Sequence, residues 1–178
     1  MVQWYRVKAR RPPQSDRLPL AFDVFFRVRF RPLVRFIVLS ESATREEAED
    51  AVEDAMHQAY RNWLDIENPE AWVRRAAKSS FIKHRERDRT RQRLSQAVGR
   101  MAGEMGECLA IADQQQQVLD MLNSLPPAQR EVMAYVYDDF SPSEIAAMIG
   151  KDPQTVRSNI RAARRTLAAM MRAQGDRW

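Results

Sequence analysis

The chain has 178 residues, 44% of them hydrophobic, with only five Gly and nine Pro, which suits one large or two small packed domains and excludes a fibrous or low-complexity chain. No apolar run approaches the roughly 18 residues of a membrane span, the first residues lack the apolar core of a signal peptide, and the single Cys108 excludes an internal disulfide or a cysteine-rich zinc site, so we expect a cytoplasmic protein without membrane insertion. The net charge of +5 is distributed over five alternating blocks, +7 (residues 1–40), −8 (41–70), +8 (71–100), −7 (101–150) and +5 (151–178), which indicates two polyanion contacts and an acidic face for a basic partner, unless each block is simply a solvated helix face.

The first predicted element is a long helix from about Pro19 to Leu39, preceded by a flexible tail over residues 1–17. Apolar residues recur at helical spacing, and Pro32 lies inside the pattern as a point where the helix kinks or is interrupted. The aromatic residues of this stripe are expected in the core, and these are Phe22, Phe25, Phe26 and Phe30.

A second helix begins after Thr44, which forms a capping box with Glu47. Its apolar stripe is narrow and ends at Trp63, and small residues in it favour close helix packing. The other faces carry carboxylates, which are spread over exposed positions without a cluster of His or Cys, so we expect neither catalysis nor metal binding there. These carboxylates are Glu46, Glu49, Asp50, Glu53 and Asp54.

A third helix begins with Asn68 as cap and Pro69 as first helical residue. Trp72, Val73 and Phe81 lie on the face expected to pack inward. The basic side chains are expected to project outward, where cations beside aromatic residues suit nucleic acid, and these are Arg74, Arg75, Lys78, Lys83, Arg85, Arg87 and Arg89.

Helical periodicity weakens over residues 91–113, which we interpret as a linker between a first helical domain (18–90) and a second (114–172), followed by a short tail (173–178). Few linker residues look able to fix the two domains relative to each other, so we predict that their arrangement is mobile. Pro126 and Pro127 end one helix of the second domain and start the next, whose core we expect to include Val132, Val136 and Tyr137. No strand pattern occurs, so the predicted fold is all-α, with two small helical domains.

The segment from Ser141 to Leu167 predicts a helix-turn-helix. Ser141 and Glu144 form a capping box, and Gly150 ends the first helix. Asp152 then caps a second helix with a buried apolar stripe and a basic outer face, the arrangement that reads the DNA major groove.

Five segments together resemble the extracytoplasmic-function (ECF) sigma factors, two-domain bacterial transcription initiation factors of the sigma-70 family. AEDAVEDAMHQAYRNW (48–63) is similar to the region-two helix that binds the polymerase clamp, and NPEAWVRRAAKS (68–79) to the helix that melts the promoter and reads the minus-ten element. LPPAQREVM (125–133) with SPSEIAAMIG, and then DPQTVRSNIRAAR, resemble region four and its recognition helix. The resemblance covers roughly residues 20–90 and 115–171.

The resemblance implies three groups of site residues and no catalytic residue, metal or cofactor. The residues implied to bind polymerase are Asp50, Glu53, Asp54, Tyr60 and Trp63. Those implied to bind the minus-ten element are Asp65, Asn68, Trp72, Arg75, Lys78, Ser79, Lys83 and Arg85. Those implied to bind the minus-thirty-five element are Arg157, Ser158, Asn159, Arg161, Arg164 and Arg165.

The implied partners are RNA polymerase core, through its clamp helices and flap, promoter DNA and an anti-sigma factor, in a cytoplasmic protein associated with the nucleoid. Two alternatives stay open. One is a helix-turn-helix regulator that binds duplex DNA without polymerase, and the other is a helical adaptor that does not bind DNA. An enzyme is the least favoured class, because the sequence has no nucleophile–base pair, Gly-rich phosphate loop or metal-ligand spacing.

Overall fold

A computed structural model describes residues 18–97 and 113–175, and within these ranges the chain is helical with no strand, which confirms the all-α prediction. The predictions for the tail 1–17, for Cys108 and most of the linker, and for the last residues 176–178 lie outside the described residues. The elements in chain order are α1 (Leu18–Glu41), α2 (Arg45–Arg61), the short 3-10 helix η1 (Trp63–Asp65), α3 (Pro69–Ala97), α4 (Asp113–Asn123), α5 (Pro127–Tyr137), α6 (Pro142–Ile149) and α7 (Pro153–Gly175).

Helix α1 continues through Pro32 as one helix. A proline removes one backbone hydrogen bond from a helix interior, but the residues that follow it are anchored by tertiary packing. Leu33, Phe36 and Ile37 are at most 1% exposed. Burial of three large apolar side chains outweighs the missing hydrogen bond, so the predicted interruption does not occur.

Helices α2 and α3 pack along a stripe of small residues. Thr44 and Glu47 form the predicted capping box at the start of α2, and the Asn68 side chain accepts a hydrogen bond from the Ala71 amide at 3.1 Å at the start of α3. Fully buried alanines on α2 allow its backbone to approach α3 closely, and these are Ala48, Ala51, Ala55 and Ala59. Trp63 lies beyond the end of α2, in η1, rather than on the helical stripe where the sequence pattern placed it.

Helices α4 to α7 form the second unit and contain the predicted helix-turn-helix. Ser141 and Glu144 make a capping box at the start of α6, and Gly150 ends this helix with φ 64°, a left-handed conformation that glycine adopts without strain. Asp152 accepts hydrogen bonds from two amides at the start of α7. In α5 the buried tyrosine is Tyr135, which is 2% exposed, and the prediction that Tyr137 continues the core is wrong, because it is 56% exposed.

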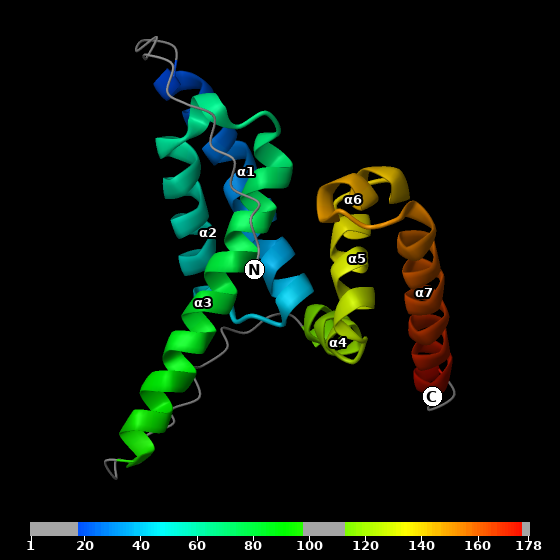
Figure 1. Ribbon diagram of the computed structural model, residues 1–178. Coiled ribbons are helices and arrows are strands. Elements are labelled where there is room, and N and C mark those ends of the chain that lie inside the picture. The colour runs from blue at the N-terminus through cyan, green and yellow to red at the C-terminus, as the bar shows by residue number, and fades with distance from the viewer. Residues whose placement is uncertain (1–17, 98–112, 176–178) are drawn as a thin grey trace.

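The two units lie against each other along a shared core. Figure 1 shows α1, α2 and α3 on one side and α4 to α7 on the other, with α5 facing the first unit and α7 outermost. The rings of Phe36 in α1 and Tyr135 in α5 meet at 4.7 Å, and buried residues of both units belong to one continuous cluster. The linker sequence does not reveal this packing, because its contacts come from side chains of α1, α3 and α5. The mobility of the two units stays a prediction.

Candidate nucleic-acid and polymerase interfaces

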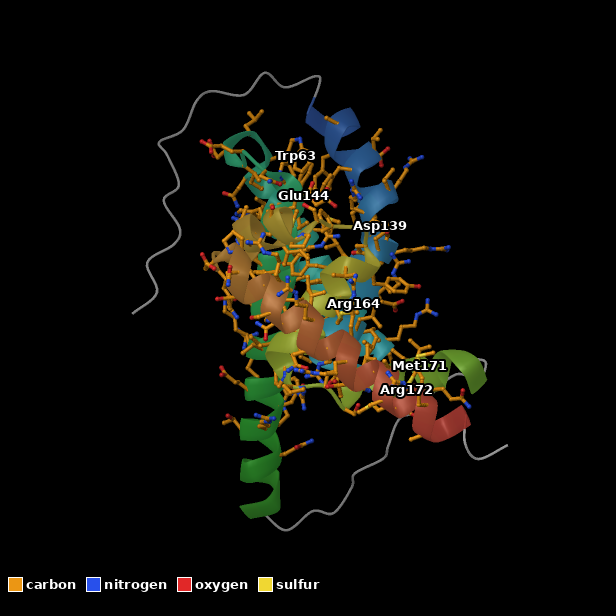
Figure 2. All side chains as sticks on the ribbon, turned by 90° about the vertical axis from the view of Figure 1, so that its right-hand side faces the viewer. Trp63, Asp139, Glu144, Arg164, Met171 and Arg172 are labelled. Carbon is orange, nitrogen blue, oxygen red and sulfur yellow. The ribbon has the colours of Figure 1, made fainter. Side chains whose placement is uncertain are left out.

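The basic face of α7 is open to solvent. Arg157, Arg161, Arg164 and Arg165 are exposed, while Val156, Ile160 and Ala163 on the opposite side are buried. The exposed positions recur at intervals of three or four residues and therefore share one face of the helix. Figure 2 shows α7 on the side of the molecule turned to the viewer, with Arg164 and Arg172 along it.

Of the two further α7 residues named from the sequence, Ser158 lies with this basic face and Asn159 does not. Ser158 is exposed, and its hydroxyl donates to the Thr155 carbonyl oxygen at 2.8 Å. Asn159 is only half-exposed. Because each residue turns the helix by about 100°, Asn159 lies on the side of α7 away from Arg157. The structure thus places the four arginines and Ser158 together and sets Asn159 apart.

The carboxylates of α2 form an exposed acidic face. Asp50, Glu53 and Asp54 are exposed opposite the buried alanine stripe. The Asp54 carboxylate lies 2.9 Å from Nε2 of His84 on α3. The other two carboxylates point into solvent, where a basic partner could reach them.

Tyr60 and Trp63 belong to an aromatic cluster at the end of α2. The Phe22 ring meets Tyr60 at 5.1 Å and Trp63 at 5.2 Å, and Trp63 also meets Phe25 at 5.0 Å. Tyr60 is 55% exposed, so this residue keeps a face for a partner. Trp63 is half-buried and contributes mainly to the packing of α1 against η1.

The residues predicted to read the minus-ten element surround the start of α3. Asp65, the last residue of η1, and Asn68, the cap of α3, are exposed before the helix. Trp72 is half-buried against the core. Further along α3, Ser79 is half-buried and Lys83 is exposed, whereas Arg85 stacks its guanidinium over the Phe81 ring at 5.5 Å.

Two basic residues of α3 predicted to read the minus-ten element, Arg75 and Lys78, are bound by helices of the second unit. Arg75 donates to the Met148 carbonyl oxygen at 3.1 Å. Lys78 Nζ lies 2.8 Å from a carboxylate oxygen of Glu131 and 3.0 Å from one of Glu41. Burial works to lower the pKa of Lys78, but the hydrogen bond and charge of Glu131, with the charge of Glu41, outweigh it and leave the pKa raised. Lys78 is therefore a charged lysine held between two carboxylates.

Arg74 was expected on the outside of α3, and this prediction is wrong, because its side chain is 2% exposed. Its two terminal nitrogens bind Glu70 at 2.9 Å and Asp138 at 2.8 Å. The guanidinium carbon lies 4.6 to 5.8 Å from the centres of three rings, those of Phe36, Tyr135 and Phe140. The only signal in the sequence was the position of Arg74, three residues from the buried alanines at 71 and 77.

Burial also raises the pKa of the Tyr135 phenol beside this cluster, aided by the charges of Glu131 and Asp138, while the charges of Arg74 and Arg75 oppose the rise. The phenol therefore stays neutral next to the buried ion pairs. Within the described residues no group of three or more His, Cys, Asp or Glu side chains is placed to hold a metal ion. No described helix is long and apolar enough to cross a membrane.

Comparisons with known proteins agree with the family resemblance seen in the sequence. Residues 115–167 match the family model "Sigma-70, region 4". Over 161 residues, which are 85% of this chain and 77% of the relative, the chain is 31% identical to the ECF RNA polymerase sigma factor SigM of Mycobacterium tuberculosis, in the strains Erdman and H37Rv. A co-crystal structure of the sigma factor RpoE with the anti-sigma factor NepR from Bartonella quintana contains a similar fold, with a TM-score of 0.67 at 24% identity over 85% of this chain and 97% of that one.

Two packed helical units, the second with an exposed basic helix in a helix-turn-helix, define a DNA-binding transcription factor. The 31% sequence identity to SigM, over 77% of that protein, makes the class of protein more specific. The chain belongs to the ECF RNA polymerase sigma factors, which act in transcription initiation. We refer to α1–α3 as region two and to α4–α7 as region four.

Proposed function

We propose that the chain binds RNA polymerase core and directs it to promoters that carry a minus-ten and a minus-thirty-five element. The observation that carries this proposal is the presence of three distinct charged surfaces on one chain. These are the acidic face of α2, the exposed cations of α3, which include Arg75 and Lys83, and the basic face of α7. A regulator that binds only duplex DNA requires the last of these and has no use for the first two.

In this proposal α7 reads the minus-thirty-five element in the major groove. Arg157 and Arg161, near the start of the helix, are nearest to the base edges, because the first turns of a recognition helix enter the groove. A bidentate contact between an arginine and guanine is worth about 1–3 kcal/mol of discrimination. Arg164 and Arg165 then contact phosphates and fix the register without reading sequence.

The loop at Asp65 and Asn68 and the start of α3 would bind the minus-ten element as a single strand. Extruding a base from the duplex costs a few kcal/mol. Stacking on aromatic side chains is worth about 1–3 kcal/mol per base, and phosphate contacts from Lys83 and Arg85 add to it. Contacts of this size are comparable to the cost of extruding a base, so in this proposal they aid melting by holding a strand that is already open.

The partners follow from the charges and from the names of the relatives. SigM is named as an RNA polymerase sigma factor, and RpoE was crystallised with an anti-sigma factor. We assign polymerase binding to Asp50, Glu53 and Asp54, because an exposed acidic face suits a basic partner surface. We also place the protein in the cytoplasm, at the nucleoid, with an anti-sigma factor as a further partner.

The test is transcription in vitro with purified core polymerase on a library of promoter sequences. We expect transcripts that depend on the added protein and start downstream of a shared two-element motif. The double variant Asp50→Asn/Glu53→Gln should bind core about tenfold more weakly, which corresponds to about 1.4 kcal/mol. Asp139→Asn is the control, since Asp139 is also an exposed aspartate but lies in region four. Tight binding to duplex DNA without any dependence on core would contradict the proposal and favour a regulator that acts alone.

A further inference from the structure

One uncharged residue in the middle of the basic face of α7 was not among the predicted minus-thirty-five residues. Gln154 is exposed in the first turn of this helix. Because each residue turns the helix by about 100°, Gln154 lies about 20° from Arg161 around the helix axis and about 60° from Arg157. The buried residues of α7 lie on the opposite side. Gln154 therefore shares the face that is open to a duplex.

The cap of α7 fixes the backbone of Gln154. The Asp152 carboxylate accepts hydrogen bonds from the Gln154 amide at 2.7 Å and from the Thr155 amide at 3.2 Å. Within the described residues, the side-chain amide of Gln154 forms no hydrogen bond of its own. A side chain that starts from a fixed backbone and keeps its hydrogen-bonding groups free is suited to read one defined position in a groove.

The other uncharged polar residues at the start of α7 are less suited to read a base. The Ser158 hydroxyl donates to the Thr155 carbonyl oxygen at 2.8 Å, so its hydrogen is already used. Thr155 and Asn159 lie about 100° and about 140° from Gln154 around the helix axis. Gln154 is thus the residue that brings both a donor and an acceptor, the two groups of its amide, to the middle of this face.

Adenine presents the matching pair of groups in the major groove. Its N7 accepts a hydrogen bond and its N6 amino group donates one, so a glutamine amide can bind both at once, whereas an arginine binds the two acceptors of guanine. At about 1.5 Å per residue, Arg157 lies about 4.5 Å beyond Gln154 along the helix axis, close to the spacing of about 3.4 Å between successive bases. The two side chains can therefore reach neighbouring base pairs.

We propose that Gln154 is a specificity-determining residue that reads an adenine in the duplex element, in the base pair next to the guanine read by Arg157. The inference rests on the proposed reading of the minus-thirty-five element by α7. Arg164 and Arg165 supply affinity that depends on salt, through phosphates. Gln154 carries no charge and contributes discrimination between sequences.

The chain offers variants that keep the helix intact. Gln154→Ala removes the amide at an exposed position and introduces the best helix former. Gln154→Glu replaces the amide by a carboxylate, which accepts from the N4 amino group of cytosine and is favourable in the first turn of a helix. Gln117→Ala is the matched control, since Gln117 is an exposed glutamine of region four that lies on α4. Far-UV circular dichroism confirms that each variant is folded.

The first measurement selects bound sequences from randomised duplex DNA with the full chain, both alone and with core polymerase. We expect the parent and Gln117→Ala to select one motif with an adenine beside a guanine. Gln154→Ala should lose about tenfold of the preference for that adenine, the size of one bidentate contact, and should keep the guanine and the salt dependence of binding. Gln154→Glu should move the preference at this position to cytosine, a change that a merely structural role would not produce.

A base analogue tests the contact itself. In the selected duplex, 7-deazaadenine replaces the adenine and removes the N7 acceptor. We expect the parent to bind this duplex about threefold to tenfold more weakly, the effect of one lost hydrogen bond. Gln154→Ala should bind the two duplexes equally, because it has no amide to lose the contact.

The outcomes separate the role of Gln154 from the proposed function. A motif that Gln154→Ala leaves unchanged would overturn the proposal, and so would an equal loss with 7-deazaadenine in the parent and in Gln154→Ala. The absence of any motif for the parent, with or without core polymerase, would overturn both this role and the reading of DNA by α7. If the motif changes as expected but core polymerase yields no transcripts that depend on the chain, the role of Gln154 is supported and the failure counts against the proposed function alone.

Discussion

The ion pair between Arg74 and Asp138 should contribute far more to stability than an exposed pair of similar length. A double-mutant cycle with Arg74→Met, Asp138→Asn and the double variant isolates their coupling free energy. The side chains are 2% and 6% exposed and the two atoms lie 2.8 Å apart. Unit charges about 4 Å apart interact with about 4 kcal/mol at an effective dielectric constant of about 20, and desolvation offsets part of this. We therefore expect a coupling of about 1.5–3 kcal/mol.

The remaining partners of each group keep this coupling free energy below the penalty for breaking a buried ion pair. Asp138 retains Arg35 when Arg74 is removed, and Arg74 retains Glu70 when Asp138 is removed. Neither single variant leaves a buried charge without any counter-charge, so the full penalty of about 3–5 kcal/mol for breaking a buried pair does not apply.

The control is the pair Asp23–Arg27 on α1, which spans 3.0 Å with side chains 46% and 76% exposed. Exposed pairs four residues apart on a helix contribute about 0.3–0.5 kcal/mol. Urea unfolding followed by far-UV circular dichroism measures both cycles, and the shared core predicts one cooperative transition. Equal coupling energies in the two cycles would refute the reasoning, because they would show that burial does not strengthen the Arg74–Asp138 pair.

Three further predictions concern region four. Ile145→Ala should destabilise the protein by about 2–4 kcal/mol in urea unfolding, since Ile145 is 0% exposed and its loss leaves a cavity, whereas Ile145→Val should cost about 1 kcal/mol. Arg164→Ala should lower the affinity for duplex DNA equally for all sequences and reduce the slope of log affinity against log salt by about 0.9, the value for one phosphate contact. Arg157→Ala should instead lower the affinity by an amount that depends on the DNA sequence. Hydrogen bonds with Ser141 lower the pKa of Glu144. The stability that this capping box contributes is therefore present above the unfolded pKa of the Glu144 carboxyl and is lost as pH falls through its folded pKa. Ser141→Ala should flatten that part of a curve of thermal midpoint against pH, and an unchanged curve would contradict this role of the capping box.

Much of the local structure follows from neighbouring residues alone. The helix starts at Thr44, Asn68 and Ser141 were predicted and confirmed, because a cap joins atoms only three residues apart and does not depend on the rest of the fold. The exposed arginine face of α7 was predicted for a similar reason, since helical periodicity fixes which residues share a side. The family resemblance, which the comparisons confirm, was also carried by local segments.

The sequence by itself therefore determined the helices, their caps, the helix-turn-helix and the family. Only the tertiary structure decided that region four packs on region two, and that Arg74 is buried rather than exposed. Its partner Asp138 is 64 residues away in the chain, and no local pattern encodes a contact between elements so far apart. The environment of a charged side chain depends on which helix comes to lie against it, and for α3 that helix is α5.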